Sequence, residues 1–254
     1  MSKTRKYLGL SGIAASFVFL FNPNLNIIDI LPDFIGYAIL VISLSYLSDL
    51  NEDIALARKR FGYMIIADVA KLLSLFIVFG APSRDEQNSM LLLMAFVFAT
   101  VEIFLLVSAY GALFGGLMGL GYRFENNSVL ASKGYGYSKN KTEKIRSFTL
   151  FFVVLKASAY VLPEFTVLST HSYDEGSRVV YIYEFVGLLR GFAMLVCIAV
   201  GIVWLVKIIG YFKSLKNDAR FMDALNEEYR TNILPKESLF VRKWVKLISL
   251  LFCV

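Results

Sequence analysis

The residues best able to do chemistry in this chain are charged side chains that interrupt long apolar runs. Five of them lie well inside these runs: Asp68, Lys71, Glu102, Lys156 and Arg190. An ionised side chain at the centre of a membrane helix costs about 2.5 to 3.5 kcal/mol on insertion scales, so each should face protein or water and pair with another charge. We therefore predict a polar centre to which several helices contribute.

Two interpretations of this polar centre stay open. Asp68 and Lys71 are three residues apart and share a helix face, so they can neutralise each other, which leaves Glu102 to pair with Lys156 or Lys71. The centre is then either a buried salt-bridge network that orients the helices, or a polar cavity for a small solute or a proton. Arg190 lies nearer the predicted outer side, where its long side chain can reach the interface.

Motifs for enzyme chemistry are absent or incomplete. The only histidine, His171, falls in a predicted outward loop, so zinc motifs such as H-E-x-x-H cannot form, and neither a metal nor another cofactor is predicted. Residues 53–58 superficially resemble the start of the alcohol phosphotransferase signature of phospholipid synthases. However, Ile54 and Ala67 stand at its two glycine positions and Lys71 at its first aspartate. No catalytic residue is predicted, and whether the chain is an enzyme stays open.

The composition is that of a membrane protein. The chain of 254 residues is 57% apolar and 18% charged, whereas a soluble chain is about half apolar and about a quarter charged. Most of the apolar runs are long enough to cross a hydrocarbon core of about 30 Å. We expect an all-α, polytopic bundle of six or seven transmembrane helices, with spans at about 7–21, 34–48, 62–80, 90–113, 147–168 and 185–211.

The positions of lysine and arginine predict the orientation of the bundle. The segments 1–6, 49–61, 121–146 and 213–243 carry 19 of the 26 basic residues. The segments between them carry only two, Arg84 and Arg178. Because cytoplasmic loops are enriched in basic residues, the N-terminus is predicted to be cytoplasmic. The net charge of +6 then reflects topology and attraction to anionic lipid headgroups, and no nucleic-acid partner is predicted.

The chain divides into three predicted regions. Residues 1–212 form the transmembrane bundle, 213–239 a cytoplasmic amphipathic helix and linker, and 240–254 a seventh transmembrane helix that is short or cut off. Within the bundle, the first run is interpreted as an uncleaved signal anchor. Residues 22–33 form an interfacial or partly re-entrant outer segment, in which Asp33 caps the next helix. The amphipathic helix is predicted from apolar residues at helical spacing: Leu215, Ala219, Met222, Leu225 and Tyr229.

Glycines recur at helical spacing in two of the runs. Gly111, Gly115 and Gly119 share one helix face, as do Gly187 and Gly191. Such faces let another backbone approach closely. We expect helix packing at these positions, either within the chain or at an interface with a second copy or another membrane protein.

The stretch from Asn22 to Tyr37 resembles the start of uncharacterised polytopic membrane proteins of Gram-positive bacteria. The resemblance implies a bacterial plasma membrane and carries over no activity. Because Cys197 lies inside an apolar run and Cys253 at the end of the chain, no disulfide is predicted. The expected function is binding or transport of a small solute or ion through the polar centre. The alternative is a non-enzymatic assembly factor or interaction partner in the lipid bilayer.

Overall fold

The computed structural model describes residues 8–21, 33–80, 84–124, 126, 140–165 and 180–233. Within these ranges the chain is all-helical, with seven α-helices, one short π-helix and no strand, which confirms the predicted all-α class for the described residues. The helices are α2 (Leu10–Leu20), α3 (Asp33–Ser48), α4 (Glu52–Phe79), α5 (Arg84–Arg123), α7 (Lys141–Phe165), α8 (Val180–Asn217), α9 (Ala219–Glu228) and the π-helix η2 (Tyr229–Ile233).

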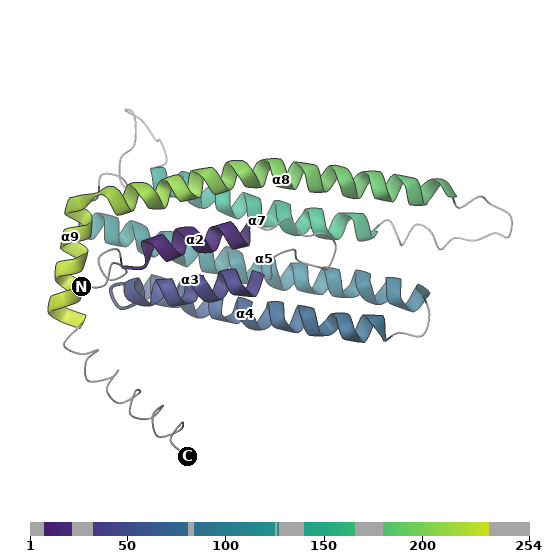
Figure 1. Ribbon diagram of the computed structural model, residues 1–254, viewed down its shortest axis with the longest axis horizontal. Coiled ribbons are helices and arrows are strands. Elements are labelled where there is room, and N and C mark those ends of the chain that lie inside the picture. Colours follow the sequence, from purple (N-terminus) through teal and green to yellow (C-terminus); the bar gives the residue numbers. More distant parts are fainter. Residues whose placement is uncertain are drawn as a thin grey trace, which may run out of the picture.

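Six of the helices form a closed bundle. Each packs against the two next to it in the order α2, α3, α4, α5, α7 and α8, and α8 returns to α2. Figure 1 shows α4, α5, α7 and α8 as long helices along the longest axis, with α2 and α3 beside only part of their length. The ring therefore has six helices near one end and four helices near the other.

The short helices α2 and α3 differ in length from the four long helices. At about 1.5 Å per residue, the 11 residues of α2 and the 16 of α3 are shorter than a hydrocarbon core of about 30 Å. The 25 to 40 residues of α4, α5, α7 and α8 exceed it. Two stretches are long and apolar enough to cross a membrane, Met90–Arg123 in α5 and Gly191–Asn217 in α8.

Aromatic side chains fill the inside of the ring. Phe17 of α2 is fully buried and contacts rings from two long helices, Tyr110 of α5 and Trp204 and Phe212 of α8. The Trp204 indole nitrogen donates a hydrogen bond of 3.0 Å to the Thr149 hydroxyl of α7. The short helix α2 is thus held between α5 and α8, and a buried hydrogen bond links α7 to α8.

Most helices continue past the apolar runs that predicted them. Helix α4 begins at Glu52, not near residue 62, because the side chain of Asn51 accepts hydrogen bonds from the backbone N–H groups of Asp53 (2.9 Å) and Ile54 (3.2 Å). Lysine, arginine and glutamate are good helix formers, so a helix can continue where hydropathy falls. The predicted loop at 49–61 is therefore mostly helix.

Helix α9 crosses one end of the bundle (Figure 1). The carboxylate of Asp218 caps it by accepting from the Phe221 backbone N–H at 3.2 Å. Of the predicted apolar face, Leu215 is buried but belongs to α8. Met222, Leu225 and Tyr229 are also buried, whereas Ala219 is exposed. An ion pair of 2.6 Å also joins Glu228 at its end to Arg123 of α5. The predicted outer segment before Asp33 and the predicted helix at 240–254 lie outside the described residues.

Candidate functional site

An ion pair lies between two helices at the inner face of the bundle. The Lys156 amine of α7 donates to one carboxylate oxygen of Asp33, the first residue of α3, at 2.8 Å. Both residues are buried, with 9% of Lys156 and 4% of Asp33 exposed. Lys156 is in the middle part of α7, so Asp33 lies at the same depth. Asp33 was predicted only to cap its helix, and the structure gives it a partner on another helix.

The second carboxylate oxygen of Asp33 is also buried. Within the described residues, this Oδ1 atom has no hydrogen-bond partner. A buried acceptor without a partner costs about 1 to 3 kcal/mol, and more when it is charged. A proton or a small cation at this oxygen would remove that cost.

The other predicted charges converge on the same region. Asp68 and Lys71 of α4 are both buried, with 9% and 6% of their surface exposed. The buried ring of Tyr37, one turn after Asp33, is close enough to Asp68, Glu102 and Asp33 for their charges to act on its phenol. Carboxylates from α3, α4 and α5 are therefore within electrostatic range of one buried tyrosine.

A second buried tyrosine, Tyr110 of α5, lies near the same charges. Its buried phenol is within the electrostatic range of Lys156, Asp33 and Glu102. The charged residues within electrostatic range of these two tyrosines come from four helices, α3, α4, α5 and α7. From here on, the polar centre means Asp33, Asp68, Glu102 and Lys156 together with Lys71, which is buried one turn after Asp68 on α4. Asp33 thus joins the predicted set, and Arg190 is left out of it.

Glu102 differs from the other four members of the polar centre. It is half-buried, and within the described part of the chain it forms neither a hydrogen bond nor an ion pair. The predicted pairing of Glu102 with Lys156 is replaced by the pair of Lys156 with Asp33. Arg190 belongs to α8, but its side chain lies outside the described residues.

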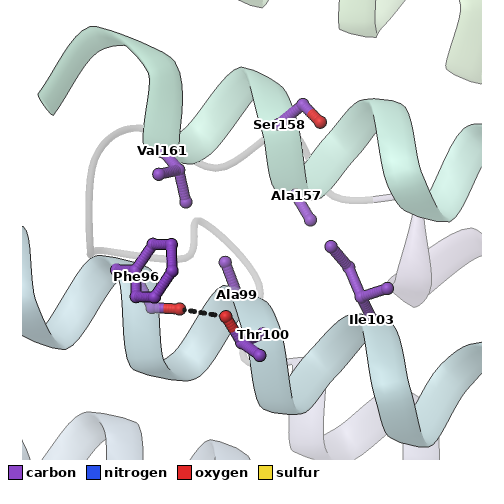
Figure 2. A pocket seen from close by; sticks show the side chains of 7 residues that line it. All are labelled: Phe96, Ala99, Thr100, Ile103, Ala157, Ser158 and Val161. Carbon is purple, nitrogen blue, oxygen red and sulfur yellow. Dashed lines mark hydrogen bonds between the residues drawn. The ribbon is translucent and has the colours of Figure 1, made fainter. Parts of the chain in front are cut away.

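A cavity of about 220 Å³ lies between α5 and α7 (Figure 2). Among the described lining residues, Thr100 and Ser158 are polar, and the Thr100 hydroxyl donates to the Phe96 carbonyl at 2.8 Å. The rest of the lining is apolar: Phe96, Ala99, Ile103, Ala157 and Val161. Ala157 follows Lys156 in sequence, but consecutive residues of a helix point in different directions. The cavity is therefore a separate apolar space beside the polar centre.

The predicted glycine face of α5 is not where another backbone comes closest. A Cβ atom at Gly111 or Gly115 would meet only side-chain atoms at 3.8 and 3.9 Å, and one at Gly119 a side-chain nitrogen at 3.3 Å. At Gly116 it would lie 2.5 Å from the Ile54 side chain and 3.0 Å from the Ile54 backbone nitrogen. The close approach of α4 thus falls one residue away from the predicted face.

In α8, the predicted glycines are also not the closely packed ones. A Cβ atom at Gly191 would meet nothing within 4 Å, and the surroundings of Gly187 are outside the described residues. At Gly201, which was not predicted, a Cβ atom would lie 2.6 Å from the Phe21 ring and 3.0 Å from the Phe152 ring.

No group of three His, Cys, Asp or Glu side chains within the described residues could hold a metal ion. Cys197 is a buried free thiol, while Cys253 and His171 lie outside the described residues. No family model, no curated protein and no solved structure matches this chain. The candidate site therefore rests on the geometry of the polar centre alone.

Proposed function

We propose that this chain is a multi-pass membrane protein, inserted with its N-terminus on the cytoplasmic side. The support is an apolar belt, which consists of large hydrophobic side chains exposed on all four long helices. Two of its members are Phe104 of α5, with 76% exposed, and Val206 of α8, with 67% exposed. In a soluble protein such a surface would be costly, whereas lipid accommodates it. Other members are Ile66, Leu73, Phe76, Phe96, Phe151, Val154, Leu195 and Ile202.

The distribution of charge supports the orientation. The end of α3 and the start of α4, next to the basic segment 49–61, lie at the end of the bundle where α9 lies (Figure 1). The end of α4 and the start of α5, next to the segment 81–89 with its single basic residue, lie at the other end. An amphipathic helix at the end of the bundle also suits a cytoplasmic membrane surface.

Labelling of single cysteines tests this topology. With Cys197 and Cys253 replaced by serine, we expect Ser172→Cys to react with a membrane-impermeant thiol reagent in intact cells, and Ser132→Cys to react only after the cells are opened. Both changes replace serine by cysteine in segments predicted to be loops, so the difference reports the side of the membrane. Labelling of Ser132→Cys from outside would show that the orientation is reversed.

The second part of the proposal is that the polar centre binds a small solute or ion. The observation that carries it is the buried Oδ1 atom of Asp33, which has no hydrogen-bond partner within the described residues. The charge balance of the centre also favours a bound cation. Among its described residues, three carboxylates and two amines leave one negative charge in excess, and a low-dielectric environment favours neutralisation of that charge. A proton or another monovalent cation is therefore the ligand that the centre favours.

Glu102 is the residue by which ligand binding can be tested without breaking the ion pair. Purified protein in liposomes should carry protons down an imposed pH gradient, and Glu102→Gln should reduce this flux by about tenfold, which corresponds to about 1.4 kcal/mol. Because Glu102 has no ion-pair partner within the described residues, the melting temperature of Glu102→Gln should differ little from that of the parent protein.

Asp223→Asn provides the control for this experiment. It removes a negative charge from an exposed position on α9, outside the polar centre, and should leave the flux unchanged. If the parent protein passes neither protons nor sodium or potassium ions, and Glu102→Gln changes no ion binding, the proposed ligand is wrong. A loss of stability in Glu102→Gln without any change in flux would favour a purely structural centre.

A further inference from the structure

Two arginines converge on one face of α5 from opposite sides. Arg60 of α4 donates a hydrogen bond from its guanidinium to the Ser108 carbonyl at 2.8 Å. Arg146 of α7 approaches Gly111, where a guanidinium nitrogen lies 3.8 Å from the place a Cβ atom would take. Ser108 and Gly111 are three residues apart and therefore neighbours on the same helix face. Both arginine side chains are half-buried, and their contacts with α5 fall within one turn of that helix.

Neither arginine is neutralised within the described part of the chain. No carboxylate there lies within 4.0 Å of either guanidinium. Each of the two helices also carries an acidic side chain within two turns of its arginine. Asp53 lies beside Gly115, one turn away, and the Glu143 carboxylate accepts a hydrogen bond from the Asn140 backbone N–H at 3.0 Å. Two positive charges that contact the same turn of α5 favour the binding of an anion there.

Both arginines have donors left for such an anion. A guanidinium carries five N–H donors in a planar fork, and the contact with Ser108 uses one of those on Arg60. Because Gly111 has no side chain, it leaves room for a ligand beside the Arg146 guanidinium. The fork geometry of arginine suits the oxygens of a phosphate group.

The arginines also lie at the edge of the apolar belt. Lys207 of α8 lies over the Phe148 ring at 4.7 Å, and Lys59 of α4 lies 6.0 Å from the Tyr63 ring. On each long helix most of the exposed large apolar residues lie on one side of this level, as Phe104 and Phe151 do. Basic residues at the edge of an apolar belt are typical of the height of lipid headgroups.

We propose that Arg60 and Arg146 bind the phosphate of an anionic phospholipid headgroup on the cytoplasmic leaflet. The acyl chains of this lipid would lie along the belt, over the exposed face of α5. The charge complementarity and the adjoining apolar surface together favour a lipid over a free anion, because only a lipid contacts both. This inference depends on the proposed insertion into a membrane, but it does not depend on a ligand in the polar centre.

Thermal unfolding of the full-length protein in detergent micelles tests the lipid site. Phosphatidylglycerol should raise the melting temperature, whereas phosphatidylcholine and inorganic phosphate should not. In Arg60→Gln and in Arg146→Gln, the phosphatidylglycerol concentration for half of the effect should rise by about tenfold, since each loses a charge-assisted contact to phosphate. Lys213→Gln on α8 removes one exposed positive charge elsewhere and should keep the response of the parent.

Further variants keep the test decisive if the glutamine variants fold poorly. Arg60→Lys and Arg146→Lys preserve the charge but lose the fork, so they should retain part of the response to phosphatidylglycerol. An unchanged response in the double glutamine variant would overturn the proposal, and so would an equal response to inorganic phosphate. Since no flux is measured, a negative result with Glu102→Gln leaves this outcome unaffected, while thiol labelling tests membrane insertion separately.

Discussion

Lys156→Met should be among the most destabilising single substitutions in the polar centre. It removes the amine that pairs with Asp33, so the buried Asp33 carboxylate loses its ion-pair partner. Breaking a buried ion pair from one side costs about 3 to 5 kcal/mol. At about 2 to 4 °C per kcal/mol for a chain of this size, the melting temperature in detergent should fall by roughly 6 to 20 °C.

Asp33→Asn in the background of Lys156→Met should recover much of this loss. The asparagine keeps the shape of the side chain and removes the unpaired charge, so the double variant should be more stable than Lys156→Met alone. Lys207→Met is the control, since it removes a lysine that is exposed at the surface beside an aromatic ring. If the melting temperature of Lys156→Met is within about 2 °C of that of the parent, water solvates Asp33 and the ion pair is hydrated.

The polar centre could be predicted from sequence in part. Four of its five charged residues interrupt apolar runs, and the cost of a charge in lipid is enough to predict that Lys156 and Asp68 face protein. Asp33 could not be found in this way. It stands at the junction of a proline-containing segment and a helix, where an aspartate is an ordinary cap. Only the short length of α3, which starts part-way along the bundle, places that junction at the depth of Lys156.

Helix boundaries were less predictable than the existence of the helices. Hydropathy detects the part of a helix that contacts apolar surroundings, so the charged ends were assigned to loops. The end of α8 shows the consequence. The helix continues to Asn217 and is interrupted only by Asp218, whose carboxylate caps α9. The chain changes direction at Asp218, whose backbone is extended and not helical.

The glycines show a limit of spacing patterns. Gly111, Gly115 and Gly119 have the repeat of a packing face, yet the helix also carries Gly116, and no spacing rule says which side of α5 faces α4. That choice depends on where the cap of α4 lies. Asn51 and Ile54 form the start of α4 and touch α5 at Gly116.

Gly116→Ala should therefore destabilise the protein, whereas Gly115→Ala should not. In the interior of a helix alanine is better than glycine by about 1 kcal/mol, so Gly115→Ala should leave the melting temperature unchanged or raise it. At Gly116 the added methyl would lie 2.5 Å from the Ile54 side chain and 2.7 Å from the Asn51 side-chain oxygen.

Relief of that overlap affects both packing and capping. Overpacking of a close contact costs about 1 to 3 kcal/mol. The same Asn51 oxygen accepts the hydrogen bonds of Asp53 and Ile54 that begin α4, and loss of such a cap costs about 1 kcal/mol. Against the gain in helix propensity, the net loss is about 1 to 3 kcal/mol, so the melting temperature should fall by about 2 to 12 °C.

A second-site change separates this contact from a general effect on α5. Ile54→Ala removes the side chain that the new methyl would meet, so in that background Gly116→Ala should cost less than it does alone. The neighbouring Gly115→Ala should give the same small effect in both backgrounds, because its nearest atom is an Asp53 oxygen at 3.9 Å. If Gly115→Ala destabilises more than Gly116→Ala does, the predicted glycine face, and not Gly116, is the seam between α5 and its neighbours.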